Sequence, residues 1–509
     1  MSTTNQPASP LNASAVRAAL VAAVIVFLAG LWRALPDMVD DAYITFHCVK
    51  NFVHHGQLTF NLGTRVEAFS NPLFAFLLIP FEVLGIPLPI AARLLGFAAF
   101  GGAVALVYKL IVHLHGDRQL ALLGGACTLA SFPFLYYSIT GLETGLFGTL
   151  LLALVARLIF CKRGGVLDAL LVLSVLLSRP EAPLYIALLF AAAILPRFRE
   201  NRALLLMWVT GGLAFLAMVV IRRIYYGLWL PNPFYAKAPG TADLDPATSA
   251  LGASMSYLLE FLWRCGFVIP VLAVVAALLH VREAAFRILG CVVLACVIFA
   301  AYTGGDWFPA SRYLLPMLPT MIVAGVVGFA RFATRTKVST TLLAMGLFVS
   351  VLASSVATLV EFTLWRNRYP YHVMNGSDCA RAGRWMRDNL APDTHIVAYR
   401  IGALGYETGF TVIDLLGLAD HDIAMVLAAT PEFHPARTMG SGNPAITAIV
   451  LRERPDAVLA VQPAEIPPTA RKVLYGMTFT FIRSFPQGAD QQWVLYRRDV
   501  PPTAPPHSQ

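Results

Sequence analysis

The fold is decided by residues 18–46, which read AALVAAVIVFLAGLWRALPDMVDDAYITF. Residues 18–35 form an apolar run close to the ~20 residues that a bilayer-spanning helix needs. The run follows a polar tail ending in Arg17 and lacks a small-residue cleavage site, which predicts a retained transmembrane helix with a cytoplasmic N-terminus. A signal peptide is the alternative. With the helix retained, residues from 37 onward lie outside the membrane.

The composition of the whole chain is that of a polytopic membrane protein. Of its 509 residues, 57% are hydrophobic and only 13% are charged, which excludes a disordered chain, a nucleic-acid-binding module and a disulfide scaffold. The formal net charge of +9 therefore indicates basic cytoplasmic loops and an affinity for anionic lipid or phosphate, and it implies no nucleic-acid partner. The seven cysteines indicate no particular redox compartment.

Ten further apolar runs predict that the chain crosses the membrane eleven times in total. A shorter run at 72–84 has 13 residues and is expected to form an interfacial or re-entrant helix on the outer side. This assignment places the basic clusters of the loops in the cytoplasm, as the positive-inside rule requires, with Arg222 and Arg223 as the exception. The ten runs are 92–113, 119–138, 142–160, 166–178, 181–196, 203–222, 266–281, 286–302, 313–331 and 338–360.

Eleven crossings from a cytoplasmic N-terminus place the end of the chain outside. In this last part the sequence predicts a small soluble α/β domain, built from an amphipathic helix at 377–390 and short strands near 396–399, 411–415, 457–461 and 493–496. The expected organisation is a cytoplasmic tail (1–17), a transmembrane domain (18–361) whose first outer loop spans 37–91, an extracytoplasmic α/β domain (362–500) and a disordered tail (501–509).

Polar residues that interrupt the apolar runs gather, on this topology, on the outer face. Ionisable groups at membrane depth are costly and by default mark a substrate path. For Arg179 and Glu181, the alternative is that the two residues cap a tight helical hairpin and pair with each other. The five polar groups are Asp40 with Asp41; Glu143; Arg179 with Glu181; the segment 225–237; and Asp306 and Trp307 followed by Arg312.

The acidic pair Asp40-Asp41 opens a segment whose apolar residues suit an amphipathic helix lying along the outer surface. A carboxylate at a helix N-terminus is stabilised in its charged form, which suits a general base, and a simple N-cap is the alternative. Lys237 and Arg312 supply cationic donors for a phosphate, with contact to lipid headgroups as their alternative. The histidines near the acidic pair match no metal-ligand spacing, so no metal site is predicted.

Motifs spread along most of the chain carry a resemblance to a known family. They are Asp40-Asp41-Ala42-Tyr43-Ile44-Thr45-Phe46 and Ser70-Asn71-Pro72-Leu73 in the first outer loop, then Thr140-Gly141-Leu142-Glu143-Thr144, Ser178-Arg179-Pro180-Glu181, Leu230-Pro231-Asn232 with Tyr235-Ala236-Lys237, Gly305-Asp306-Trp307 with Arg312-Tyr313, and Ile413-Asp414-Leu415. Together they resemble the bacterial polyprenyl-phosphate-dependent GT-C glycosyltransferases, most closely the mycobacterial terminal arabinofuranosyltransferase AftB and its homologues. This chain has His47-Cys48 where relatives often carry Arg-Tyr, which leaves the sugar and the acceptor open.

The resemblance implies a polytopic α-helical membrane protein of GT-C type, with about 11 transmembrane helices, juxtamembrane helices in the first outer loop and the small C-terminal α/β domain. It implies an enzyme that transfers a sugar, arabinofuranose by analogy, from a polyprenyl-phosphate donor to a cell-envelope glycan on the outer face of a bacterial inner membrane. Asp40 falls on the family's proposed catalytic base and Asp41 on its partner. No cofactor is required, and a donor with a single phosphate gives little need for a divalent cation. The implied substrate-binding residues are Glu143, Arg179, Glu181, Asn232, Tyr235, Lys237, Asp306, Trp307 and Arg312.

Two other functions remain open. A transporter or lipid flippase should have ionisable groups near the bilayer midplane and broken helices in two corresponding halves. Here the polar groups are predicted at one face, the sequence has no convincing internal repeat, and a C-terminal soluble domain has no role in transport. A non-catalytic scaffold of the same fold is the third possibility, and it requires that the acidic pair be dispensable.

Overall fold

Two compact units make up the computed structural model of the chain, which describes residues 11–161, 163–197, 199–237, 250–336, 339–367, 375–430 and 443–499. The first, which we call the helical unit, comprises Met1–Met38, Asn71–Ile224 and Leu244–Leu364. The second, the α/β unit, comprises Val39–Ser70, Tyr225–Asp243 and Trp365–Gln509. The expected disordered tail at 501–509 and most of the expected cytoplasmic tail at 1–17 lie outside the described residues.

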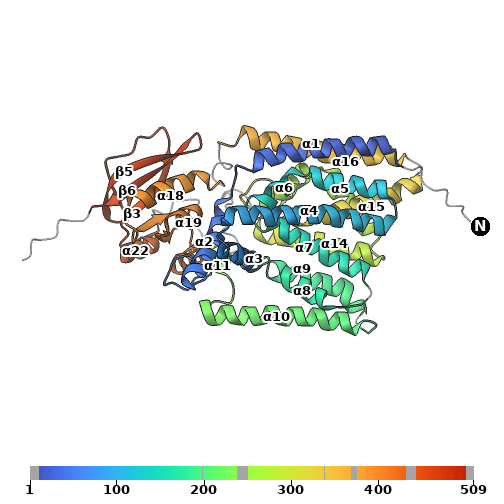
Figure 1. Cartoon of the computed structure of the whole chain (residues 1–509), viewed down its shortest axis with the longest axis horizontal. Coiled ribbons are helices and arrows are strands. Elements are labelled where there is room, and N and C mark those ends of the chain that lie inside the picture. The colour runs from blue at the N-terminus through green and yellow to red at the C-terminus, as the bar shows by residue number, and fades with distance from the viewer. Residues whose placement is uncertain are drawn as a thin grey trace, which may run out of the picture. The chain divides into compact units, whose positions relative to one another are not determined.

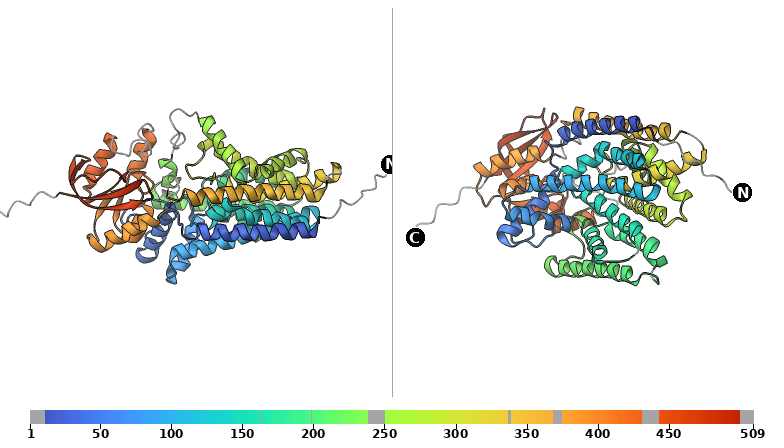
Figure 2. Two further views of the ribbon diagram at one scale, coloured as in Figure 1. Left: turned by 90° about the horizontal axis from the view of Figure 1, so that it is seen from above. Right: turned by 45° about the vertical axis from the view of Figure 1, so that its right-hand side comes forward.

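Long apolar helices build the helical unit. The first, α1 (Ala13–Ala34), packs against α5 (Arg118–Ala130) and α16 (Thr340–Leu364). Helix α4 (Leu88–His115) packs against α5 and α7 (Thr144–Phe160), and Figures 1 and 2 show these helices running along a common direction. The other helices are α3 (Pro72–Val83), α6 (Phe132–Ile139), α8 (Val166–Leu176), α9 (Ala182–Leu189), α10 (Arg202–Tyr226), α12 (Ala250–Arg264), α13 (Val268–Leu279), α14 (Ala284–Thr303) and α15 (Leu318–Thr336), with a π-helical turn at Phe190–Ile194 and 3₁₀ turns at Leu195–Arg197 and Leu315–Met317.

Among the described residues, six helices are long and apolar enough to cross a membrane: α1, α4, α10, α14, α16 and the run Leu315–Ala333. Two more spans follow if α5 with α6 and α12 with α13 each count as one, although these pairs are bent by 58° and 107°. The expected runs at 142–160, 166–178 and 181–196 form shorter apolar helices, so that by length and composition alone the described residues hold six to eight full-length spans. The expected interfacial run at 72–84 forms α3.

Local sequence explains the broken helices. Pro133 lies in the first turn of α6, and a proline cannot continue the hydrogen-bond ladder of α5, so one expected run becomes two helices that meet at Ser131. Between α12 and α13, Gly266 has a φ of 75°, a left-handed conformation that ends a helix. A hydropathy pattern registers the apolar residues on both sides of such a break and does not register the bend.

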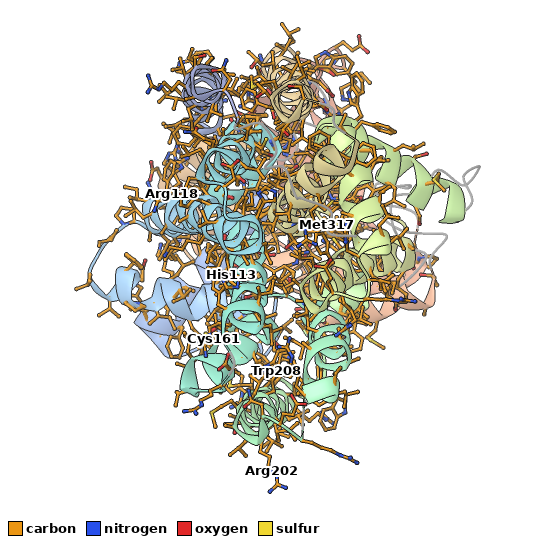
Figure 3. All side chains as sticks on the ribbon, turned by 90° about the vertical axis from the view of Figure 1, so that its right-hand side faces the viewer. His113, Arg118, Cys161, Arg202, Trp208 and Met317 are labelled. Carbon is orange, nitrogen blue, oxygen red and sulfur yellow. The ribbon has the colours of Figure 1, made fainter. Side chains whose placement is uncertain are left out.

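One end of the helical unit gathers loops that the charge pattern assigns to the cytoplasm (Figure 3). There the ring of His113, near the end of α4, lies 4.7 Å from the ring of Phe160 at the end of α7. Arg197, which precedes α10, donates a hydrogen bond to the carbonyl oxygen of Leu158 at 3.1 Å. These contacts place the ends of α4 and α7 beside the start of α10, and the side of the membrane that they face stays a prediction.

A six-stranded sheet forms the α/β unit, in the order β2-β1-β3-β6-β5-β4. β1 runs parallel to β2 and β3, and the other neighbouring strands are antiparallel. The expected helix and all four expected strands of this region are confirmed, while β4 and β5 are strands that the sequence did not predict. The strands are β1 (His395–Ala398), β2 (Thr411–Asp414), β3 (Ala457–Pro463), β4 (Arg471–Leu474), β5 (Met477–Gln487) and β6 (Gln491–Arg498), and the helices are α18 (Ser377–Asn389), α19 (Gly402–Thr408), α20 (His421–Ala429) and α22 (Pro444–Glu453).

The α/β unit also contains α2 (Asp40–His55), whose apolar side packs against α19. The rings of Tyr43 and Phe46 lie 5.5 and 6.2 Å from the ring of Tyr406. A Cβ atom on Gly402 would lie 2.0 Å from the carbonyl oxygen of Asp40, so only glycine permits this approach. The apolar side of α2 is therefore covered by α19, in place of the membrane surface that the sequence suggests. The expected first outer loop divides between the two units after Ser70.

Candidate functional site

Asp40, the first residue of α2, is buried, and its carboxylate lies at the N-terminus of α19. Its Oδ1 accepts a hydrogen bond from the backbone N–H of Ala403 at 3.0 Å, and its Oδ2 accepts one from the backbone N–H of Gly402 at 3.2 Å. The first N–H groups of a helix have no partner within the helix and favour a carboxylate. Asp40 therefore caps α19, while the N-cap of its own helix is Val39.

The surroundings of Asp40 favour a basic carboxylate. Burial raises the pKa of Asp40 above its ordinary value, and the two N–H groups together with the charge of Arg400 oppose that shift. The neighbouring Asp41 raises the pKa of Asp40 further and is itself only half-buried. Each carboxylate oxygen of Asp40 has a second lone pair beyond the one used by the backbone N–H, so the group can accept a proton from a substrate while α19 fixes its orientation.

Asn232 is anchored on the loop that follows β2. Its Nδ2 donates hydrogen bonds to the carbonyl oxygens of Gly417 and Leu418 at 2.7 and 3.1 Å. Its Oδ1 lies 3.0 Å from the Nδ1 atom of His421. Because the buried amide is engaged by this loop, Asn232 positions α11 (Asn232–Ala236), and its expected contact with a substrate stays a prediction.

Asp414, the last residue of β2, shapes the loop that holds Asn232. Its carboxylate accepts hydrogen bonds from the backbone N–H groups of Leu416 and Ala419, both at 2.9 Å. Burial raises the pKa of Asp414 to about 7, despite these hydrogen bonds. The sequence places Asp414 in a motif without a role, and the structure assigns it the support of this loop.

Helix α11 carries Tyr235 and leads into Lys237. The ring of Tyr235 lies 6.2 Å from the ring of His421 in an edge-on arrangement. Lys237 is the C-cap residue of α11 and is exposed. The loop after β2 therefore orients a segment that ends in a surface ammonium group, which is a suitable point charge for a phosphate.

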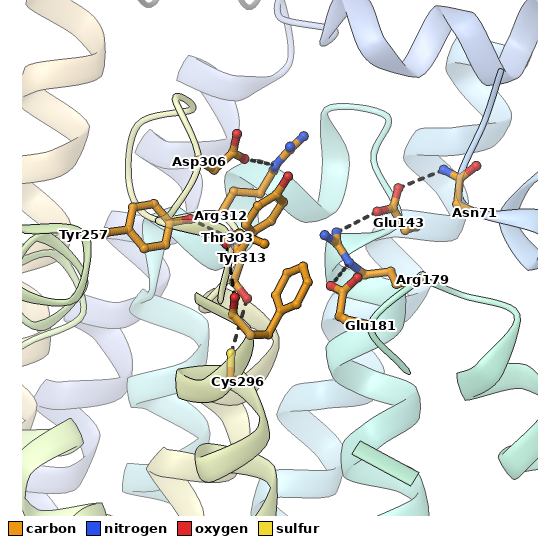
Figure 4. A network of polar contacts seen from close by, with 11 residues as sticks. Asn71, Glu143, Arg179, Glu181, Tyr257, Cys296, Thr303, Asp306, Arg312 and Tyr313 are labelled. Carbon is orange, nitrogen blue, oxygen red and sulfur yellow. Dashed lines mark hydrogen bonds and ion pairs between the residues drawn. The ribbon is translucent and has the colours of Figure 1, made fainter. Parts of the chain in front are cut away.

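In the helical unit, Arg179 lies between two carboxylates (Figure 4). Its Nη1 forms an ion pair with Glu143 at 2.7 Å, and its Nε pairs with Glu181. Asn71 donates a hydrogen bond from its Nδ2 to the second oxygen of Glu143 at 2.8 Å. The alternative that Arg179 and Glu181 pair with each other is confirmed, and Glu143 completes a buried cluster whose two carboxylates outnumber its one guanidinium.

A second ion pair lies close to this cluster. The Nε of Arg312 contacts Asp306 at 2.7 Å, and its guanidinium lies over the ring of Phe308 at 3.9 Å from the ring centre. The ring of Tyr313 lies 5.2 Å from the guanidinium of Arg312 and 5.3 Å from that of Arg179. The ring of Tyr313 thus lies within cation–π distance of both ion-paired arginines, which Figure 4 shows on neighbouring elements of the helical unit.

The backbone before Arg312 is strained. Ala310 and Ser311 have φ values of 63° and 50°, in a left-handed region that costs an ordinary residue ~1–2 kcal/mol. Glu260 holds both residues, because its carboxylate accepts a hydrogen bond from the N–H of Ala310 at 3.0 Å and one from the hydroxyl of Ser311 at 3.2 Å. Trp307, three residues before Ala310, is half-buried. Backbone strain such as that of Ala310 and Ser311 is often found at functional sites.

The predicted site residues divide between the two units. Glu143, Arg179, Glu181, Asp306 and Arg312 form one group in the helical unit. Asp40, Asp41, Asn232, Tyr235 and Lys237 belong to the α/β unit, and the convergence of all of them on one outer face stays a prediction.

Sequence reasoning missed several supporting residues. Asn71 and Tyr313 lay within quoted motifs but received no role, whereas Glu260 and Gly402 carried no signal that a single sequence could provide. No group of three or more His, Cys, Asp and Glu side chains that could hold a metal ion occurs among the described residues.

Comparisons with known proteins identify the architecture. The chain is similar to the crystal structure of ArnT from Cupriavidus metallidurans bound to undecaprenyl phosphate, with a TM-score of 0.54, 13% identity, and coverage of 97% of this chain and 100% of that one. It is also similar to the archaeal oligosaccharyltransferase AglB from Archaeoglobus fulgidus in complex with an inhibitory peptide and a dolichol-phosphate, with a TM-score of 0.54, 11% identity, and coverage of 87% of this chain and 69% of that one.

Two sequence comparisons give no further information about function. Residues 366–496 match the model of a domain of unknown function, DUF8728. No curated protein sequence matches the chain. The likeness to the two solved structures, together with the helical unit and the small C-terminal sheet, shows that the chain has the GT-C fold.

Proposed function

We propose that this protein is a membrane-embedded glycosyltransferase that transfers a sugar from a polyprenyl-phosphate donor to a glycan acceptor on the outer face of a bacterial inner membrane. The observation that carries the proposal is the extent of the GT-C likeness, which covers 97% of this chain and the whole of ArnT and so includes both units. The two similar structures are described with undecaprenyl phosphate and dolichol-phosphate bound, which supports a lipid-phosphate donor here. The motif resemblance favours arabinofuranose as the sugar and a cell-envelope glycan as the acceptor.

In the proposed reaction Asp40 removes the proton from the acceptor hydroxyl, and Asp41 assists it. The burial that raises the pKa of Asp40 makes it a stronger base, and the N–H groups of Gly402 and Ala403 hold it in place. Asp41 is the alternative base, because it is the more exposed of the pair.

The leaving phosphate needs cations, and the contacts of the candidate arginines differ. Arg179 is matched by two carboxylates, so a phosphate would have to displace one of them. The guanidinium of Arg312 also lies over the ring of Phe308, and Lys237 is exposed, so we assign the phosphate to these two residues. Arg179 then serves to hold Glu143 and Tyr313 in position.

Product analysis tests the proposal. The full-length protein, purified into lipid nanodiscs, is given a panel of polyprenyl-phosphate sugars and envelope glycan fragments, and the products are identified by mass spectrometry. We expect transfer from one donor, reduced about 10²- to 10⁴-fold by Asp40→Asn or Asp41→Asn, whichever is the base. Asp388→Asn, at an exposed position of α18, is the matched control. If no donor is used, the proposal fails and the scaffold function remains. If a donor is used but neither variant of the acidic pair lowers turnover, the assignment of the base to this pair fails.

A further inference from the structure

The α/β unit contains a second polar cluster around Arg400, whose charge also acts on the pKa of Asp40. A small cavity of about 10 Å³ is lined by Tyr399, Arg400, Leu459, Val461 and Trp493. A cavity of this size has room for about one water-sized group. Tyr399 and Arg400 directly follow β1, Leu459 and Val461 belong to β3, and Trp493 belongs to β6.

The topology of the sheet places this cavity where ligands bind in open α/β sheets. From β1 the chain passes through α19 to β2 on one side, and it later returns to β3 on the other side of β1. The carboxyl ends of β1 and β3 therefore flank the point at which the strand order reverses, the usual position of a ligand crevice. The two strands pair only at Ile396 with Ala457 and at Val397 with Val458, so beyond Val397 the chain after β1 leaves β3.

Three of the side chains that line this cavity each have a polar atom that lacks a hydrogen-bond partner within the part of the chain that the structure describes. These atoms are the hydroxyl of Tyr399, the Nη1 of Arg400 and the Nε1 of Trp493, and all three atoms are buried. An unsatisfied buried polar group costs about 1–3 kcal/mol, so three beside one cavity need an explanation. The guanidinium of Arg400 lies 5.7 Å from the centre of the Trp493 ring, which brings two of these side chains together.

The chemistry of the three atoms selects the ligand. Guanidinium and indole N–H groups only donate hydrogen bonds, and a phenol hydroxyl can donate one. The burial of Arg400 lowers the pKa of its guanidinium, which nevertheless remains charged, since arginine is not deprotonated in proteins. The charges of Asp40, Asp378 and Asp41 already act on Arg400 and offset part of its positive charge. The donors that lack a partner match a group that only accepts hydrogen bonds, as the oxygen of an oxyanion does.

We propose that this crevice receives one oxygen atom of an oxyanion, the carboxylate or phosphate of a ligand, through donors of Arg400, Tyr399 and Trp493. The apolar side chains of Leu459 and Val461 exclude water from the bound oxygen and strengthen each hydrogen bond. Carboxylate and phosphate offer the same acceptor chemistry, and the experiment below distinguishes them. The proposal is independent of sugar transfer, because the site is tested by binding without any lipid donor.

Calorimetric titration of the full-length protein in nanodiscs tests the site with three probes: D-glucuronate, inorganic phosphate and neutral D-glucose. We expect saturable binding of glucuronate or phosphate, whichever the crevice accepts, and none of glucose. Arg400→Gln should weaken binding about tenfold or more, because a charge-assisted hydrogen bond is lost. Arg471→Gln, at an exposed position of β4, is the matched control and should leave the affinity unchanged.

Variants that keep the shape of the side chain distinguish a loss of binding from a folding defect. Tyr399→Phe removes only the hydroxyl, and Trp493→Phe removes the indole N–H, so each should weaken anion binding several-fold in a protein with a normal thermal unfolding profile. Equal binding of glucose and glucuronate, equal affinities in all variants, or no saturable binding of any probe would overturn the proposal. The cavity would then hold only a water molecule.

Discussion

Replacing Asp40 by Asn separates its two roles, because the structure assigns each carboxylate oxygen a different backbone partner. Oδ1 accepts the N–H of Ala403 and Oδ2 accepts the N–H of Gly402. An asparagine side chain has one acceptor oxygen and one NH₂ donor. One of the two N–H groups at the start of α19 therefore meets another donor in the variant, and Asp40→Asn perturbs the cap as well as the base.

The magnitudes of the two effects differ enough to be distinguished. A buried N–H group without a partner costs about 1–3 kcal/mol of the free energy of unfolding. Part of this cost is offset, because the amide removes a buried charge whose desolvation raises the pKa of Asp40. The net destabilisation should therefore lie at the lower end of that range. Loss of a general base lowers turnover about 10²- to 10⁴-fold in molecules that remain folded.

Two measurements on the same preparation give the answer. Hydrogen exchange of the 402–403 amides reports the opening of α19, and the rate of sugar transfer, corrected for the folded fraction, reports the chemistry. We expect faster exchange together with a large loss of turnover. If exchange accelerates while the corrected transfer rate stays within about threefold of wild type, Asp40 is only a cap and the base must be sought at Asp41 or Asp306.

Three further predictions concern the phosphate, the loop after β2 and the topology. Arg312→Ala and Lys237→Ala should each lower kcat/KM for the lipid donor about 10- to 150-fold without changing the KM for the acceptor, and unchanged donor kinetics in both variants would assign these residues to lipid headgroups. Because the pKa of Asp414 rises from 3.8 to about 7 on folding, the thermal stability of the protein should fall as the pH rises between these values. Asp414→Asn should remove this pH dependence. A variant that keeps the wild-type pH profile contradicts the assignment. In intact cells a membrane-impermeant thiol reagent should label a cysteine at exposed Arg471 and fail to label one at Arg199, and the opposite pattern would invert the topology.

Local patterns in the sequence predicted the elements, and contacts between distant segments explain most of the errors. Every expected apolar run contains a helix, because a segment buried away from water must satisfy its backbone hydrogen bonds within the segment. Pro133 divides the expected run at 119–138 into two helices without lowering its hydropathy, and the expected runs at 142–160, 166–178 and 181–196 form helices of 17 residues or fewer.

For the candidate site, too, the sequence predicted individual residues but not their contacts with distant segments. The pair of Arg179 with Glu181 was one of the two expected alternatives and is confirmed, whereas the pair of Arg312 with Asp306 was not predicted. Their partners across the fold were not predictable from one sequence. Asn232 was expected to bind substrate, and the engagement of its amide by Gly417 and Leu418, some 185 residues away in the chain, was not predicted. Such pairings depend on tertiary structure, to which neither composition nor periodicity is sensitive.

The contact between Asp40 and α19 joins residues that are 362 positions apart in the chain. At a synthesis rate of about 5–20 residues per second, α2 emerges roughly 20–70 s before its partner exists. During this interval the apolar side of α2, including Tyr43 and Phe46, has no protein to cover it. Biogenesis of this protein therefore requires that a chaperone or the membrane interface shelter the segment. A ribosome that stops before residue 402 leaves behind a helix bundle with an exposed, aggregation-prone loop, which quality-control proteases can recognise.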